Sequence, residues 1–463
     1  MGRTDLISNE VLERFGKHSP ITVMARLAMQ RALDPRWIDE VFETESQSQY
    51  TRELLFSTAV EVMSLVVAGL RPSVHAVAKS MDLPVSVQAL YDKLKHAEPQ
   101  VIRALVSGSA QRLTPVVCEL LRRPTRMVKG FRLRIVDGNH LPASQKRLKE
   151  LREVRGAALP GQSLVVYDPD LELVMDVLPC EDAHTQERML MKELIATAVK
   201  GELWLADRNF CTRPVLCGLI ERESNFLIRE HAINPNPTEV SKLKRIGRIE
   251  TGVVYEQMVS IEDDAENTHQ LRRIELHLDQ PTEDGDRVIR LLTNLPKSLK
   301  AKQLARLYRR RWRIENLFQR LESVLHSEVS TLGVPGAALL AFGVALLTYN
   351  VLALLQRAVR VKHARTLDEA QMELSTYYIA VEIRAHYAGM LIAVAAATWE
   401  AYESLTDRQF AGLLLKLAAN VDPKRFCSHP RKPKIVKKKG YVSKRTVCSH
   451  VATARLLNKE GQK

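Results

Sequence analysis

Three carboxylates in this chain have the sequence context of a shared metal site. Asp137 and Asp207 each follow an apolar run that is typical of a β-strand. Glu315 lies in a dense basic run that is predicted to be helical. Hard divalent cations bind carboxylate oxygens and keep positions for water and phosphate. If the three acids converge, they predict a site for two Mg²⁺ ions, which Mn²⁺ can replace, and phosphoryl-transfer chemistry.

The basic run around Glu315 also offers groups that bind phosphate and nucleobases. At about 100° per residue, Tyr308, Arg311 and Glu315 fall on one side of a single helix. We expect Tyr308 and Arg311 to contact phosphate, Arg311 through a bidentate fork. Trp312 is expected to stack on a base. Each acid also has a structural interpretation, because strand-end aspartates commonly cap turns and a helical Glu often pairs with a neighbouring Arg.

The elements that must position these acids alternate between strands and helices, which predicts an α/β fold. Strands are expected over 131–136, 163–167, 171–178, 201–206 and 226–229, and helices over 185–200 and 213–223. In this order the first and fourth strands are neighbours in a mixed sheet. Asp137 and Asp207 would then lie at the same edge, where such sheets bind ligands.

The length of 463 residues predicts several regions. We expect a helical DNA-binding region over 1–125, a catalytic core over 126–231 and 300–360, a β-strand insertion over 232–299, a helical region over 361–422 and a basic tail over 423–463. The core should include one long helix over 299–325 that carries the basic run.

A helix-turn-helix rhythm occurs over 73–95, within the N-terminal helical region. In that interpretation Ser86, Gln88 and Lys93 would face a DNA groove. An ordinary helical hairpin has the same rhythm, and the sequence leaves both interpretations open.

The net charge of +14 comes mostly from the tail. Residues 424–463 contain thirteen Lys or Arg and one Glu, a net +12, which leaves +2 for the rest. This distribution predicts a basic arm that attracts a polyanion, with nucleic acid as the expected partner.

The remaining composition predicts a cytoplasmic protein without a membrane partner. Six scattered cysteines favour a reducing compartment over a disulfide framework, and the first twelve residues lack a signal-peptide core. The uncharged run over 333–355 is interrupted by Pro and Gly and favours a buried core helix over a membrane span.

Two weaker patterns have open alternatives. Cys427 with His429, and Cys448 with His450, could form a zinc site, although a basic arm without metal is the preferred interpretation. His140 is expected to be a structural hydrogen-bonding residue rather than a group that contacts DNA or metal-bound water.

A basic stripe leads into the predicted insertion. Its members are Lys242, Lys244, Arg245 and Arg248. We expect them to contact a DNA backbone. The alternative is a solvated face that is balanced by Glu239 and Glu250.

The chain resembles the DDE transposases of bacterial insertion sequences, in the family with a Tyr-x2-Arg-x3-Glu-x6-Lys signature. Tyr308, Arg311 and Glu315 match that signature, and Asp137 in Val-Asp-Gly-Asn-His and Asp207 in Leu-Ala-Asp-Arg-Asn-Phe are similar to its two aspartates. The resemblance implies an RNase H-like core that is interrupted by a β-strand insertion. It also implies catalysis and metal binding by Asp137, Asp207 and Glu315.

The same resemblance implies an activity and partners. Such enzymes cleave the terminal inverted repeats of an element in double-stranded DNA and join the 3′-hydroxyl ends to target DNA, so a homodimer on DNA is expected. Glu322 occupies the position of the family's Lys, so one phosphate contact is absent or is supplied elsewhere. The alternatives are a structure-specific nuclease with the same metal chemistry and an inactive, transposase-derived DNA-binding protein.

Overall fold

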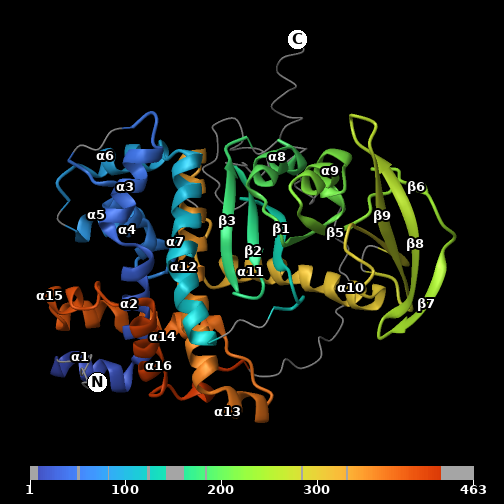
Figure 1. Ribbon diagram of the computed structural model, residues 1–463. Helices are drawn as coiled ribbons and strands as arrows, with labels where there is room; N and C mark the ends of the chain where they lie inside the picture. The colour runs from blue at the N-terminus through green and yellow to red at the C-terminus, as the bar shows by residue number, and fades with distance from the viewer. Residues whose placement is uncertain are drawn as a thin grey trace, which may run out of the picture.

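A ten-stranded sheet runs through the centre of the computed structural model, with the helical regions packed at one end of it (Figure 1). The structure describes residues 9–49, 53–81, 83–122, 126–141, 161–182, 185–282, 285–329 and 332–428. The N-terminal helices and the last helices lie together on the side of β3, while β6 to β9 lie on the opposite side (Figure 1).

The first five strands form the core sheet in the order β3-β2-β1-β4-β5. They are β1 (Arg132–His140), β2 (Gln162–Asp168), β3 (Leu173–Cys180), β4 (Glu202–Ala206) and β5 (Asn225–Arg229). β1 is antiparallel to β2 and parallel to β4, and β4 is parallel to β5. The predicted mixed sheet with its first and fourth strands side by side is therefore confirmed, in the arrangement expected of an RNase H-like core.

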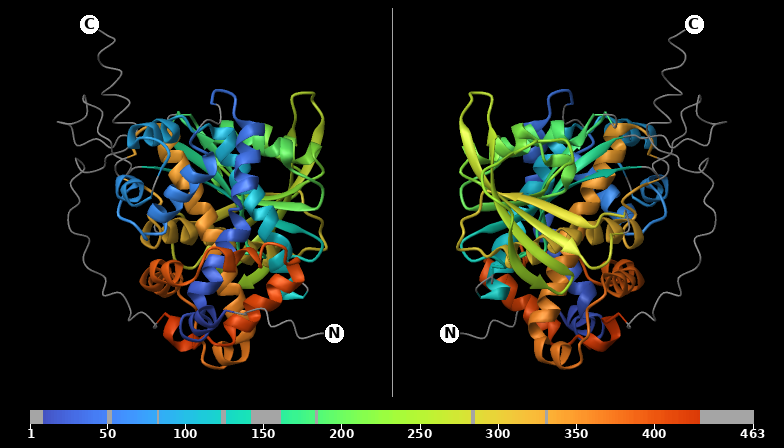
Figure 2. Two further views of the ribbon diagram at one scale, coloured as in Figure 1. Left: turned by 90° about the vertical axis from the view of Figure 1, so that its left-hand side faces the viewer. Right: turned by 90° about the vertical axis from the view of Figure 1, so that its right-hand side faces the viewer.

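The other five strands extend the same sheet. They are β6 (Thr238–Glu239), β7 (Lys244–Ile249), β8 (Gly252–Glu262), β9 (Thr268–Leu278) and β10 (Val288–Thr293). β10 pairs with β5 on one side and with β9 on the other, both antiparallel. The segment over residues 238–293 is thus hydrogen-bonded into the sheet through β10, and its strands curve away from the core (Figure 2).

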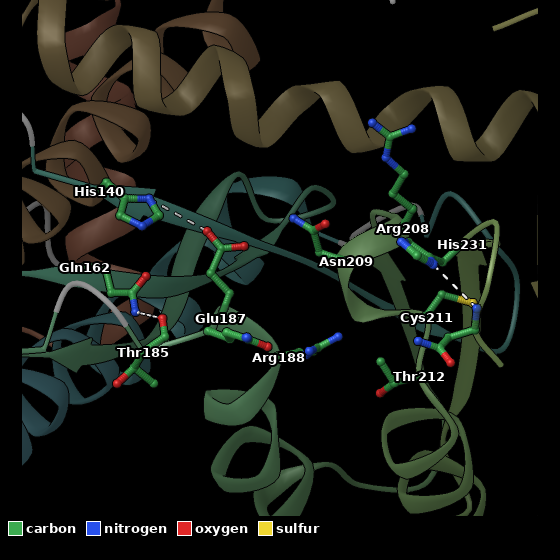
Figure 3. A pocket seen from close by; sticks show the side chains of 12 residues that line it. His140, Gln162, Thr185, Glu187, Arg188, Arg208, Asn209, Cys211, Thr212 and His231 are labelled. Atoms are coloured by element: carbon green, nitrogen blue, oxygen red, sulfur yellow. Dashed lines mark hydrogen bonds and ion pairs between the residues drawn. The ribbon is translucent and has the colours of Figure 1, made fainter. Parts of the chain in front are cut away.

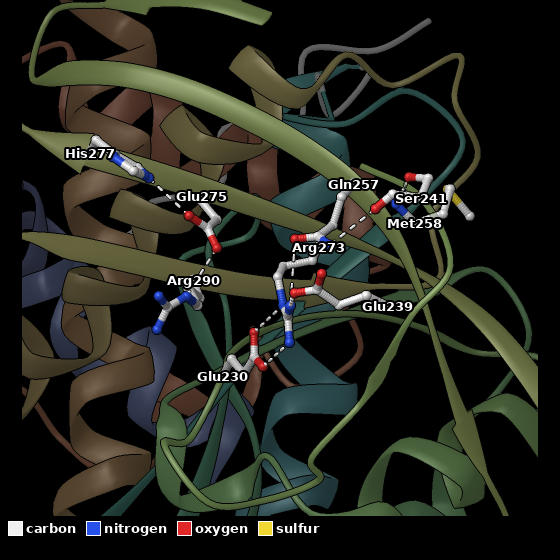
Figure 4. Close-up of polar contacts among 9 residues, drawn as sticks. All are labelled: Glu230, Glu239, Ser241, Gln257, Met258, Arg273, Glu275, His277 and Arg290. Carbon is white, nitrogen blue, oxygen red and sulfur yellow. Dashed lines mark hydrogen bonds and ion pairs between the residues drawn. The ribbon is translucent and has the colours of Figure 1, made fainter. Parts of the chain in front are cut away.

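Buried ion pairs tie the curved strands to the core (Figure 4). The Arg273 side chain on β9 is 10% exposed and donates both Nε and Nη2 to the Glu230 carboxylate, which follows β5. Arg273 also contacts Glu239 and Gln257, so one guanidinium joins three segments. Nearby, Glu275 accepts from His277 and Arg290.

Helices cover both faces of the core sheet. α8 (Glu187–Thr197) and α9 (Arg213–Glu221) pack on one face, where Val136 and Trp204 are buried. The opposite face buries Ile135 and Leu205 against the larger helical core. This alternation of neighbouring residues between the two faces is the two-residue period of a strand that is buried on both sides.

The helical regions surround α12 (Pro335–Lys362), which packs against α7 (Pro99–Leu121). The remaining helices are α1 (Glu10–His18), α2 (Pro20–Ala32), α3 (Pro35–Glu45), α4 (Phe56–Val67), α5 (Val74–Ser80), α6 (Val87–Lys95), α13 (Ala364–Glu369), α14 (Thr376–Ala393), α15 (Ala397–Glu400) and α16 (Asp407–Ala418). α12 is long and apolar enough to cross a membrane, but its most apolar window is wholly buried inside the fold. It is the core helix that the sequence predicted.

The expected DNA-reading positions of the helix-turn-helix are engaged in internal contacts. α5 and α6 form the two helices, but Ser86 caps α6 by accepting from the Ala89 backbone N–H. The Lys93 ammonium lies 4.0 Å from the centre of the Phe42 ring, and Gln88 donates to Asp92. These contacts favour the ordinary helical hairpin, because they occupy the side chains that were expected to face DNA.

The helix predicted over 299–325 is present, but it contains a 3₁₀ turn that the sequence did not predict. The structure has α10 (Ala301–Tyr308), a 3₁₀ turn over Arg309–Arg311, and α11 (Trp312–Ser323). A 3₁₀ turn advances about 120° per residue instead of about 100°, so three residues rotate the rest of the helix by about 60°. Because residues three apart eclipse in a 3₁₀ turn, this rotation brings Arg311 onto the same side of the helix as Tyr308.

Candidate active site

Asp137 lies within β1 rather than at its end. Its backbone pairs with Val165 of β2, while the parallel pairing with β4 stops at Ile135 opposite Leu205. The predicted strand end was therefore too early, because β1 continues beside β2 after it has left β4. Asp207 directly follows β4, and its Oδ1 accepts from the Asn209 backbone N–H at 2.8 Å.

Arg311 brings Asp137 and Glu315 to one point. Its Nη1 lies 2.9 Å from Asp137 Oδ2, and its Nη2 lies 2.5 Å from Glu315 Oε1. The Arg311 side chain is only 12% exposed, so the guanidinium sits between the two carboxylates with little solvent around it. The helix after the 3₁₀ turn therefore directs both Arg311 and Glu315 at β1.

The pKa of Asp137 is shifted by burial and by several charged groups nearby. Burial raises the pKa of Asp137 to about 7, and the charges of Asp207 and Glu187 raise it as well. The positive charge of Arg311 lowers the pKa, but burial is the larger effect. Asp137 is thus subject to the fields of Asp207 and Glu187 in addition to its contact with Arg311.

The carboxylate oxygens suit a hard divalent cation. The guanidinium of Arg311 demonstrates that Asp137 and Glu315 accommodate a positive group between them. Over the described ranges, no three His, Cys, Asp or Glu side chains are grouped as a metal site in this conformation. An ion held by these acids would take over the neutralising role of Arg311.

Glu187 is a fourth carboxylate that the sequence analysis missed (Figure 3). It begins α8 and lies between His140, whose Nδ1 is 3.9 Å from Glu187 Oε1, and Asn209, which donates a hydrogen bond to it. A Cβ on Gly138 would lie 2.0 Å from Glu187 Oε1, so only glycine leaves room for this carboxylate beside Asp137. The available signals were a Glu in the first turn of the predicted helix and a Gly directly after Asp137.

Glu187 also lines a cavity next to the acids (Figure 3). The cavity measures about 350 Å³, and its other lining residues include His140, Arg208 and Asn209. Burial raises the pKa of Glu187, and the neighbouring Asp207 raises it further. His140 therefore faces a carboxylate at this cavity.

Tyr308 differs from its expected role. Its side chain is buried, and the hydroxyl donates to the carbonyl of Ala206 at 3.3 Å, one residue before Asp207. Tyr308 lies on the side of the helix that carries Arg311, since residues three apart eclipse in a 3₁₀ turn. Tyr308 thus supports the end of β4, and its hydroxyl does not face the surface.

The remaining candidate DNA contacts lie at the surface. Trp312 is 58% exposed, and the Arg311 guanidinium lies 5.7 Å from its ring centre. Lys242, Lys244 and Arg245 are exposed and form no ion pair with any described residue, whereas Arg248 pairs with Asp279.

The expected balancing acids of the basic stripe are used elsewhere. Glu239 pairs with Arg273 and Glu250 pairs with Arg306. Neither neutralises Lys242, Lys244 or Arg245, so the stripe keeps its positive charge. Glu322 is exposed on the last turn of α11.

The possible zinc ligands mostly fall outside the described residues. Cys427 is buried, with its Sγ 3.1 Å from the Pro423 carbonyl oxygen. His429, Cys448 and His450 belong to the part of the tail that the structure does not describe.

One comparison with known proteins identifies the domain that this sheet belongs to. Residues 129–351 match the family model described as transposase DDE domain. No curated protein matches the chain. Among solved structures, a piggyBac transposase synaptic complex with hairpin DNA, determined by cryo-EM, is similar at 12% identity and a TM-score of 0.39, over 84% of this chain and 82% of that chain. Because the family match spans the core sheet, α10, α11 and the first part of α12, residues 129–351 are a transposase DDE domain and the chain is a DDE transposase, an enzyme of metal-dependent DNA cleavage and strand transfer.

Proposed function

We propose that this transposase cleaves the terminal inverted repeats of an insertion sequence and joins the freed 3′-hydroxyl ends to target DNA. The observation that supports the proposal best is the Arg311 guanidinium held between Asp137 and Glu315, in the field of Asp207. Arg311 joins Asp137 to Glu315, and Asp207 follows β4, the strand beside β1, so this arrangement supports a two-ion site for phosphoryl transfer.

Asp137, Asp207 and Glu315 would hold two Mg²⁺ ions, for which Mn²⁺ is a substitute. Ions bound there would activate the attacking water or 3′-hydroxyl and stabilise the leaving oxygen of an in-line displacement. Arg311 neutralises Asp137 and Glu315 in this structure. Once released from them, its planar fork is placed to bind a phosphate next to the reacting one.

The surface around the acids is suited to DNA. The exposed Trp312 ring can stack on an unpaired base. Lys242, Lys244 and Arg245 offer uncompensated charge to a phosphate backbone at the far end of the sheet. The basic tail adds non-specific attraction to DNA and nucleoid association. Two ends must be cut and joined together, so we propose a homodimer on DNA.

The test is DNA cleavage and joining with Mg²⁺ and a duplex that carries the element's own ends. Asp137→Asn, Asp207→Asn and Glu315→Gln should each reduce both reactions about a hundredfold or more, while end binding without Mg²⁺ is retained. Glu322→Gln is the matched control, since it neutralises an exposed acid on the same helix as Glu315. The assignment fails if the three variants cut and join as well as the parent. Cleavage without joining or end preference would indicate a nuclease instead.

A further inference from the structure

A positively charged site lies on the opposite side of α11 from the carboxylates. It is a cavity of about 300 Å³, and we call it the arginine pocket after four of its lining residues, which are Arg313, Arg320, Arg357 and Arg360. Arg313 and Arg320 come from α11, and Arg357 and Arg360 come from the end of α12. The family resemblance and the proposed active site use none of these four side chains.

The charge of the arginine pocket is only partly compensated. Its lining contains two acids, Glu172 and Glu373, against the four arginines. Glu172 pairs with Arg357 at 3.0 Å, and no ion pair is found for Arg313, Arg320 or Arg360 within the described part of the chain. Four like charges in one cavity repel each other, so an anion that enters it relieves this repulsion.

Arg357 supplies a second, independent observation. Its side chain is 13% exposed, and its Nε is fully buried without a hydrogen-bond partner. Its Nη2 is already engaged, by Glu172 and by the Asp170 carbonyl. A buried N–H without an acceptor costs about 1–3 kcal/mol, and the described part of the chain supplies no acceptor for this one.

The floor of the arginine pocket is rigid. Tyr167 is buried there, and it interacts with the fully buried Tyr349 of α12, which also interacts with Arg320. Arg313 donates to the Pro169 carbonyl at 3.0 Å. These contacts hold guanidinium groups in place, and fixed forks of this kind suit the oxygens of a phosphate.

We propose that the arginine pocket binds phosphodiester groups of a DNA backbone, an inference that rests on the proposed function. Arg320 follows Arg311 by nine residues, which is about 14 Å along the helix axis, or about four base pairs of duplex. A duplex is therefore long enough to span the separation of the two sites along the helix axis.

The position at which the tail begins favours DNA over a small free anion as the ligand of the arginine pocket. The Ser428 N–H donates to the carbonyl of Glu373 at the rim of the arginine pocket. The following 35 residues contain eleven Lys or Arg and one Glu. A chain segment of this charge starting at the rim extends the attraction to a long polyanion.

The test measures binding of the end duplex in EDTA, so that no cleavage takes place, at salt concentrations from low to high. The pocket variant is Arg320→Gln/Arg360→Gln, in which both altered side chains are exposed. Each neutralised phosphate contributes about 0.9 to the slope of log affinity against log salt, so the slope should fall by about 1.8 and the affinity near 0.1 M salt about 60-fold. The matched control is Arg408→Gln/Lys416→Gln, with the same loss of charge on the exposed side of α16.

The outcomes separate the possible ligands. A lower slope in the pocket variant but not in the control, with unchanged melting temperatures, supports the proposal. Equal slopes for the parent and the pocket variant overturn the proposal. This holds even if calorimetry shows that pyrophosphate binds the parent and not the variant, because the arginine pocket is then a site for a free anion. Failure of the proposed function would appear differently, as Asp137→Asn protein that still cuts DNA.

Discussion

Binding of a divalent cation to this protein should release protons below about pH 7. Burial raises the pKa of Asp137 to about 7, far above the ordinary 3.8 of an aspartate. A carboxylate must be ionised before it binds a metal ion, so the ion has to displace the proton of Asp137. We expect about 0.9 proton released per chain at pH 6, about 0.5 at pH 7 and about 0.1 at pH 8, with affinity falling about tenfold per unit below pH 7.

The sign of the linkage follows from the direction of the shift. A raised carboxyl pKa means that the folded chain favours the protonated form, so this contribution to stability is present below about pH 4 and is lost as the pH rises through about 7. The shift of about three units corresponds to about 4 kcal/mol, and this is the cost that a bound cation offsets at neutral pH. Metal should therefore stabilise the fold more at pH 8 than at pH 5.

The assay is isothermal titration calorimetry with Mn²⁺ in pairs of buffers that differ in ionisation enthalpy. The heat difference between buffers gives the number of protons released at each pH. Glu187→Gln is the informative variant, because the Glu187 charge contributes to the raised pKa of Asp137. Its loss should move the midpoint of proton release to lower pH. Tight cation binding at pH 6 without proton release would refute the reasoning.

Three further outcomes are expected. Tyr308→Phe removes the hydrogen bond to the Ala206 carbonyl and should lower the free energy of unfolding, measured by chemical denaturation, by about 0.5–1.5 kcal/mol. DNA affinity should be unchanged. A fall in DNA affinity would instead mean that the hydroxyl binds phosphate. Gly138→Ala displaces the Glu187 carboxylate, so its effect on Mn²⁺ affinity should equal that of Glu187→Ala. The double variant should bind Mn²⁺ no worse than either single variant. Additive losses of affinity would show that the two residues act independently. Arg273→Met leaves Glu230 buried without its partner and should cost about 3–5 kcal/mol, most of which Arg273→Met/Glu230→Leu recovers; equal stability of single variant and parent would contradict this account.

The sequence predicts the strands of the core well, because their apolar runs and polar boundaries are local signals. β4 ends at Ala206 as expected, so Asp207 is placed correctly from sequence alone. The helix was less predictable. Nothing in the composition of Arg309–Arg311 distinguishes a 3₁₀ turn from an α-helix, since the turn depends on how α11 packs against β1.

Contacts between residues that are far apart in the sequence are the other features that the sequence does not predict. Glu187 lies beside Asp137 only because α8 starts at the edge of the sheet, and the burial that raises the pKa of Asp137 is likewise a tertiary property. The pairing of Arg273 with Glu230 joins residues that are 43 positions apart. The pattern of either strand alone carries no sign of such a partner.

The continuous sheet fixes the position of the basic strand β7 relative to the carboxylates. From β1 to β7 the path crosses six strand pairings, through β4, β5, β10, β9 and β8. At about 4.8 Å per pairing the path along the curved sheet is about 29 Å, and it brings β7 beside α10, where a Cβ on Gly247 would lie 2.7 Å from Lys302 Nζ. The spacing between the carboxylates and the basic strand β7 is therefore set by backbone hydrogen bonds rather than by a linker. Lengthening a surface loop should leave the position of the cut unchanged, whereas removing a strand pair should shift it.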